Sequence, residues 1–171
     1  DKTFDIRISK NIEVPELPNF NKQFDLLFNH LNSLGMKVLS AIALILDKDS
    51  TFFDDWVLKG NSLLRLIHYP PLTDTSNIMR ARAHADINLI TLLVGAEESG
   101  LEVQNPSGGW IPIEAKSKSI VCNIGDMMQL VTRSKLKSTS HRVIDHNIGR
   151  STSRYSMPFF VHPSPEIELC S

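Results

Sequence analysis

The sequence has few cysteines, no excess of charge of either sign and no long apolar run. Its two cysteines, Cys122 and Cys170, cannot build a disulfide framework, so a reducing, cytoplasmic compartment is expected. Eighteen Lys and Arg residues against nineteen Asp and Glu residues give a net charge of -1, which argues against binding to nucleic acid or to an anionic membrane surface. The longest aliphatic stretch, 38–46, is much shorter than the roughly 18 apolar residues of a membrane span.

The composition that is present is typical of a folded globular domain. The 171 residues suit one domain, with 42% hydrophobic and 22% charged residues. The first residues lack the apolar core of a secretory signal, and the start at Asp1 in place of Met indicates a piece of a longer chain. Residues 1–18 are polar and end in prolines, so they are expected to form an extended arm.

A helical segment that packs on the rest of the domain is predicted for residues 19–60. Apolar side chains recur there at spacings of three and four, which is the pattern of a long amphipathic helix with one buried stripe. The stripe consists of Phe24, Leu27, Phe28, Leu31, Leu34, Val38, Ile42 and Ile45. A shorter helix is expected to follow, because Thr51 and Asp54 have the spacing of a capping box and Gly60 provides a stop.

Residues 61–165 have the pattern of short strands separated by turns, and 166–171 are left as a tail. The predicted strands are 63–69, 87–94, 101–103, 110–113, 120–124, 127–132, 140–144 and 154–161. Strands of this length and spacing, with no helices between them, favour a mainly β fold. A sandwich, barrel or jelly roll is therefore expected, and a parallel α/β sheet is not.

Three side chains of this β region could meet at one metal ion. In His84-Ala85-Asp86 an extended backbone places an imidazole and a carboxylate on the same face, and His141 lies on a later predicted strand. Two imidazoles and one carboxylate form the facial triad of non-haem Fe(II) oxygenases, although zinc accepts the same ligands. Three other histidines are interpreted as solvated or hydrogen-bonded side chains: His30, His68 and His146.

Five sequence segments, in order along the chain, carry a family resemblance. They are HADINLITLL (84–93), GLEVQ with GWIP (100–104 and 109–112), NIGD (123–126), SHRV (140–143) and RYSMPFF (154–160). Together they resemble the iron/2-oxoglutarate dioxygenases of the isopenicillin N synthase type, with order and spacing that agree over residues 50–165. The final segment is most similar to bacterial members.

The resemblance implies a double-stranded β-helix, which is a jelly roll, preceded by the long helix. It implies that His84, Asp86 and His141 are the iron ligands inside it. The implied cofactors are Fe(II), 2-oxoglutarate as cosubstrate and O2, with ascorbate left open. The implied activity is hydroxylation or desaturation of a small-molecule substrate with release of succinate and CO2.

The resemblance also implies a cosubstrate site. Arg154 and Ser156 match an Arg-x-Ser pair that holds the far carboxylate of 2-oxoglutarate, and an Arg fork with a Ser hydroxyl suits a carboxylate. Tyr69 matches a tyrosine that donates to the same cosubstrate, although a core tyrosine at a strand end is an alternative. Arg80 and Arg82 alternate with the predicted metal ligands and are candidates for binding an anionic group of the substrate.

Two other functions remain open at this point. One is an iron oxidase of the same fold that does not consume 2-oxoglutarate, since in such relatives the Arg154 and Ser156 pair can hold a substrate carboxylate. The other is an inactive binding fragment, because the N-terminal region and C-terminal helix of the family are not visible. Ile67 also departs from many plant members, which carry Asn there. The sequence specifies neither the substrate nor the oligomeric state.

Overall fold

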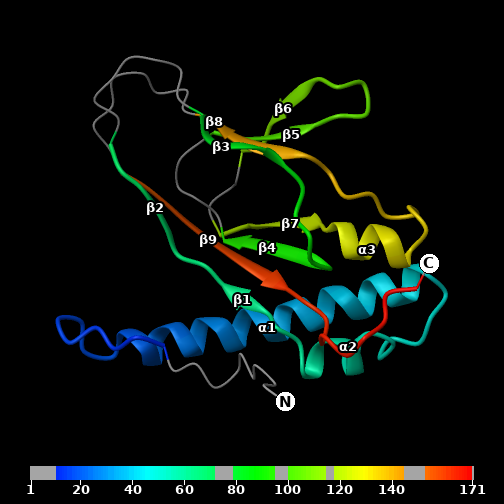
Figure 1. Cartoon of the computed structure of the whole chain (residues 1–171), viewed down its shortest axis with the longest axis horizontal. Coiled ribbons are helices and arrows are strands. Elements are labelled where there is room, and N and C mark those ends of the chain that lie inside the picture. The colour runs from blue at the N-terminus through cyan, green and yellow to red at the C-terminus, as the bar shows by residue number, and fades with distance from the viewer. Residues whose placement is uncertain (1–10, 72–78, 95–99, 115–117, 145–152, 171) are drawn as a thin grey trace. The chain divides into compact units, whose positions relative to one another are not determined.

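The computed structural model describes residues 11–71, 79–94, 100–114, 118–144 and 153–170 (Figure 1). The chain divides into two compact units. A helical unit consists of Asp1–Ser62 and Val161–Ile167, and a β unit consists of Leu63–Phe160 and Glu168–Ser171. His146 and the first ten residues of the expected arm lie outside the described residues. No helix in the described ranges is long and apolar enough to cross a membrane.

The predicted long helix is α1, Phe20–Ile45. Its most buried residues recur every three or four positions: Leu31, Gly35, Leu39, Ile42 and Ala43. Gly35 lies on this buried stripe, which explains why a residue that weakens helices is tolerated there. The prediction that Ile45 belongs to the buried stripe was wrong, because its side chain is 72% exposed in the last turn.

The second helix, α2, spans Asp54–Leu58, but it does not begin with the predicted capping box. Phe53 is the N-cap and makes no side-chain cap hydrogen bond. Instead, the Thr51 hydroxyl and amide donate to Asp49 Oδ1 at 2.6 and 2.9 Å. These two hydrogen bonds lower the pKa of the Asp49 carboxyl. The chain turns at Gly60, whose amide donates to the carbonyl of Val57.

The β unit contains two antiparallel sheets, drawn as separate layers in Figure 1. Its elements are β1 (Leu63–Leu64), β2 (Ile67–Tyr69), β3 (Met79–His84), β4 (Ile90–Val94), β5 (Leu101–Gln104), β6 (Trp110–Pro112), β7 (Ile120–Ile124), α3 (Asp126–Val131), β8 (His141–Ile144) and β9 (Arg154–Val161). One sheet has the order β1-β9-β4-β7, with β2 also paired to β9. The other sheet has the order β3-β8-β5-β6.

Three elements differ from the sequence prediction. The run 63–69, expected as one strand, forms the two short strands β1 and β2. Residues 127–132, expected as a strand, form α3, in which Met127, Gln129 and Leu130 are good helix formers and Asp126 stands in the first turn. A short apolar run does not distinguish a strand from a helix by its period. The strand β3 was not predicted, because its sequence MRARAH lacks the β-branched and aromatic residues that mark strands.

The apolar core of the β unit is formed by β4 and the residue before it, by β9 and by α3. Its fully buried side chains include Leu89, Ile90, Leu92, Met128 and Phe159. Each such side chain contributes about 1.5–3 kcal/mol through burial. The prediction of a mainly β core that follows a long helix is confirmed. Within the second sheet β3 and β8 are paired neighbours.

Candidate metal centre

The pairing of β3 with β8 brings the two predicted histidine ligands together. The strands are antiparallel, and the Cα partners are Met79 with Ile144, Ala81 with Val143, and His84 with His141. The register shifts twice along β3, so this strand carries extra residues relative to its partner. The ring centroids of His84 and His141 are 4.4 Å apart.

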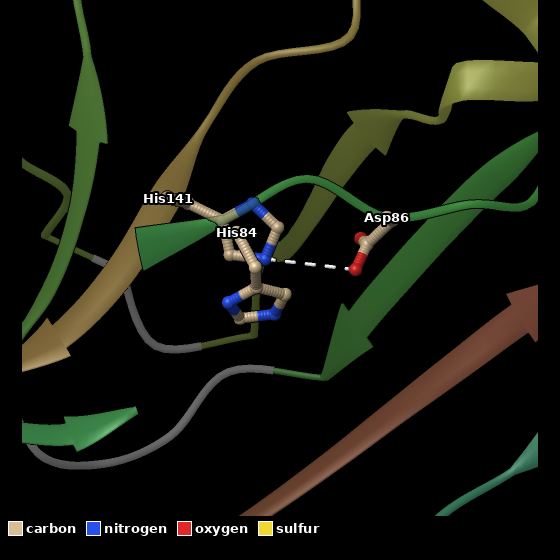
Figure 2. A group of neighbouring side chains, drawn as sticks. All are labelled: His84, Asp86 and His141. Carbon is tan, nitrogen blue, oxygen red and sulfur yellow. Dashed lines mark ion pairs between the residues drawn. The ribbon is translucent and has the colours of Figure 1, made fainter. Parts of the chain in front are cut away.

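Asp86 reaches the same point from the segment that follows β3. Its Oδ1 lies 3.6 Å from Nε2 of His141, and Figure 2 shows both rings and the carboxylate turned toward one another. One potential ligand atom from each of His84, Asp86 and His141 lies within 4.8 Å of the others. Asp86 and His141 are buried and His84 is exposed, so the group is open on one side. The structure therefore brings the three predicted ligands to one place.

Backbone carbonyls orient both imidazoles. His84 Nδ1 lies 2.7 Å from the carbonyl oxygen of Arg82, and His141 Nδ1 lies 3.2 Å from that of Thr139. Because a carbonyl can only accept, each Nδ1 carries the hydrogen in a neutral ring. The lone pair of each ring is then on Nε2, which is the atom that could bind a metal ion.

The segment that carries Asp86 is fixed by the start of α3. The amides of Gly125, Asp126 and Met127 donate to the carbonyls of Leu89, Asp86 and Ile87, respectively, at 3.0, 2.7 and 3.0 Å. A Cβ on Gly125 would overlap the backbone carbonyl oxygen of Asn88. The NIGD segment thus has a physical role, because only glycine lets these two backbone segments approach so closely.

Two buried polar residues behind Asp86 had no role predicted from the sequence. Thr91 Oγ1 donates to Asp86 Oδ2 at 2.6 Å, and Asn88 Nδ2 donates to Thr91 Oγ1 at 2.9 Å. Asn88 is 0% exposed and Thr91 2%. The available signal was the presence of Asn and Thr inside the apolar run 87–94, since buried polar groups need specific partners.

The predicted cosubstrate residues lie on the paired strands β2 and β9. Tyr69 and Arg154 are Cα partners, and the Arg154 guanidinium carbon is 5.3 Å from the Tyr69 ring centroid. Arg154 and Ser156 are buried while Tyr155 between them is exposed, so the pair shares the inner face of β9. In its sheet β9 is the neighbour of β4, the strand that carries Thr91.

The two candidate substrate arginines have different surroundings. Arg80 donates to the carbonyl of Pro70 at 2.5 Å, and its guanidinium carbon is 5.9 Å from the Tyr69 ring centroid. The side chain of Arg82 is exposed, and its backbone carbonyl accepts from His84. The register shift between Ala81 and His84 interrupts the simple alternation on which both assignments depended.

A jelly roll with two imidazoles and one carboxylate at a partly open site has the ligand set of the mononuclear non-haem Fe(II) enzymes. Comparison with known proteins agrees. The sequence profile of the 2OG-Fe(II) oxygenase superfamily matches residues 60–163. The chain belongs to this superfamily.

Individual relatives support the same assignment. The 2-oxoglutarate-Fe(II) type oxidoreductase hxnY of Emericella nidulans is 35% identical over 157 residues, covering 90% of this chain and 44% of the relative. A Caulobacter crescentus protein described as a 2OG-Fe(II) oxygenase family member is 43% identical, with a TM-score of 0.90 over 99% of this chain and 55% of its own. A full-length Neurospora crassa protein, solved in complex with alpha-KG, is 30% identical, with a TM-score of 0.85 over 91% and 54%.

These relatives confirm several predictions at the level of the family. The fold is that of the 2OG-Fe(II) oxygenases, and the family's metal and cosubstrate are Fe(II) and 2-oxoglutarate. Small-molecule substrates are expected for this family. The chain spans about half the length of the relatives it matches.

Proposed function

We propose that this chain is the catalytic core of an Fe(II)- and 2-oxoglutarate-dependent dioxygenase that hydroxylates or desaturates a small molecule. The observation that carries the proposal is the grouping of His84, Asp86 and His141, whose potential ligand atoms lie within 4.8 Å of one another. Family membership indicates the type of reaction, and the three donor side chains indicate where the metal would bind.

The donor set fits Fe(II). His84 and His141 present Nε2 because their Nδ1 atoms face carbonyls, and Asp86 presents Oδ1 because Oδ2 accepts from Thr91. These three side chains would hold the metal and leave its remaining positions for other ligands. Bound there, Fe(II) supplies O2 activation coupled to the conversion of 2-oxoglutarate to succinate and CO2.

Arg154, Ser156 and Tyr69 would hold the far carboxylate of 2-oxoglutarate. A buried guanidinium is a strong, planar donor for a carboxylate, and Ser156 adds a hydroxyl from the same face of β9. Tyr69 supports this arrangement because its ring lies against the Arg154 guanidinium. Their role is to orient the cosubstrate and exclude water from it.

Arg82 would bind an anionic group of the primary substrate. Its side chain is exposed, two residues before His84. Arg80 stays a candidate for the same role, although its contacts to Pro70 and the Tyr69 ring also suit support of Tyr69. We also propose a cytoplasmic location, where Fe(II) and the free thiols of Cys122 and Cys170 persist in reduced form.

Anaerobic titration followed by exposure to oxygen tests the function. The full chain should bind one equivalent of Fe(II), then 2-oxoglutarate, and should form succinate when O2 is admitted. O2 uptake that does not require 2-oxoglutarate would favour an oxidase of the same fold. Failure to bind Fe(II) stoichiometrically would favour an inactive binding fragment.

A further inference from the structure

We propose that Thr91, supported by Asn88, is a positioning residue that determines which oxygen of Asp86 faces the metal. This inference rests on the proposed function, because it assigns a role to two residues behind a proposed metal ligand. Thr91 Oγ1 lies 2.6 Å from Asp86 Oδ2. Thr91 and Asn88 are both buried, Asn88 in the segment between β3 and β4 and Thr91 on β4.

The hydrogen bonds in this group run in one direction. Asn88 Nδ2 lies 3.0 Å from the carbonyl oxygen of Ile90, which can only accept, so the amide group of Asn88 is oriented with its NH2 on that side. Its second hydrogen points to Thr91 Oγ1 at 2.9 Å. The hydroxyl oxygen of Thr91 therefore accepts from Asn88, and its single proton is free to be donated elsewhere.

Two acceptors lie within reach of that proton, and their distances from Thr91 Oγ1 show which one it bonds to. Asp86 Oδ2 is 2.6 Å away, whereas Asn88 Oδ1 is 3.3 Å away. A hydrogen bond to a carboxylate is also stronger than one to a neutral amide oxygen. The hydroxyl proton accordingly goes to Asp86 Oδ2.

This arrangement makes the two oxygens of Asp86 unequal. Oδ2 is bound by the protein interior, and Oδ1 is the oxygen that lies 3.6 Å from His141 Nε2. Asp86 then presents one oxygen to a cation in a fixed direction. A single carboxylate oxygen occupies one position on the metal, which leaves more positions for the cosubstrate and O2 than a carboxylate that binds through both oxygens.

The chain offers a matched control for the test. Thr132 is also buried, at 5% exposed, and its hydroxyl donates to the Met128 carbonyl at 2.8 Å. It lies at the end of α3, so its hydroxyl bonds to the backbone of that helix and not to a proposed metal ligand. Replacement of either threonine by valine removes one buried hydroxyl and keeps the side-chain shape.

The experiment is anaerobic titration of the full chain with Co(II), a probe that binds the same ligands and reports their geometry through its visible absorption. Thr91→Val should raise the Kd for Co(II) roughly 10- to 100-fold, which is the effect of losing an outer hydrogen bond to a ligand, and should change the Co(II) spectrum. Thr91→Ser keeps the hydroxyl and should restore both. Thr132→Val should leave the Kd and the spectrum as in the wild type.

The outcomes separate this inference from the proposed function. A wild-type chain that fails to bind Co(II) overturns the metal centre itself. A wild-type chain that binds Co(II), with the same Kd and spectrum in Thr91→Val, overturns the positioning role alone. If Thr91→Val does not fold, Thr91→Cys takes its place, since a thiol is a weaker donor. An unchanged Kd in that variant also contradicts the inference.

Discussion

His84 and His141 are Cα partners across the β3–β8 ladder, with ring centroids 4.4 Å apart at an interplanar angle of 53°. The pair exists because β3 lies at the edge of its sheet with β8 as its neighbour, and because the register of β3 shifts before His84. Asp86, two residues later, then joins them from outside the strand. The site thus depends on strand register as well as on residue identity.

Asp86→Ala should abolish Fe(II) binding and turnover with little loss of fold. The substitution removes the single carboxylate of the group, and two imidazoles alone hold Fe(II) weakly. Anaerobic Fe(II) titration and succinate formation are the measurements, with circular dichroism to confirm the fold. The control is Asp55→Ala, which removes an exposed carboxylate from α2. Normal activity in Asp86→Ala would contradict the ligand assignment.

Arg154→Ala should weaken 2-oxoglutarate binding by about 2–5 kcal/mol, because it removes the charged partner of a buried carboxylate. Calorimetry with the anaerobic, metal-loaded chain measures this loss, and the Fe(II) affinity should stay unchanged. Arg65→Ala is a matched control, because the Arg65 guanidinium also lies over a ring, that of Phe160, but is exposed. Equal 2-oxoglutarate affinity in wild type and Arg154→Ala would show that the cosubstrate binds elsewhere.

Gly125→Ala should lower the free energy of unfolding by about 1–3 kcal/mol. The new Cβ would overlap the carbonyl oxygen of Asn88, a backbone atom that cannot rotate away. Because this contact holds the segment behind Asp86, metal affinity should fall as well. Gly109→Ala serves as the control, since a Cβ there meets only the side chain of Asn105. Equal urea midpoints for the two variants would argue against the close approach.

Arg142→Ala should destabilise the β unit by about 3 kcal/mol, because removal of the arginine takes a charged partner away from the buried Glu102. Arg142 Nε donates to Glu102 Oε2 at 2.7 Å, and the guanidinium carbon lies 4.1 Å from the Trp110 ring centroid. Arg142→Lys, which keeps the charge but not the planar group, should lose less. A denaturation midpoint that both variants share with the wild type would contradict this role.

Much of the fold was predictable because its signals are local. The apolar spacing in residues 20–45 predicts α1, and alternating or β-branched runs predict strands such as β7 and β9. The candidate metal ligands were proposed from residue type and spacing, and the structure places these three side chains together. The candidate cosubstrate residues came from the family resemblance, because spacing alone did not specify them.

The features that were missed depend on long-range contacts. The extra residues in β3 are defined only against β8, its partner late in the chain. The first amides of α3 donate to carbonyls of the segment after His84. The sequence of residues 126–131 alone does not show that these carbonyls lie nearby. Thr91 and Asn88 are an exception, because Thr91 lies five residues after Asp86 and three residues after Asn88, and their hydrogen bonds depend on how the chain turns between β3 and β4.

The central claim is that His84, Asp86 and His141 hold one ferrous ion, and an anaerobic crystal structure with Fe(II) and 2-oxoglutarate tests it most directly. Anomalous scattering at the iron edge should give one strong peak, bonded to Nε2 of each histidine and to Oδ1 of Asp86. A peak at a different set of side chains, or full 2-oxoglutarate occupancy with no iron at these three residues, would contradict the account.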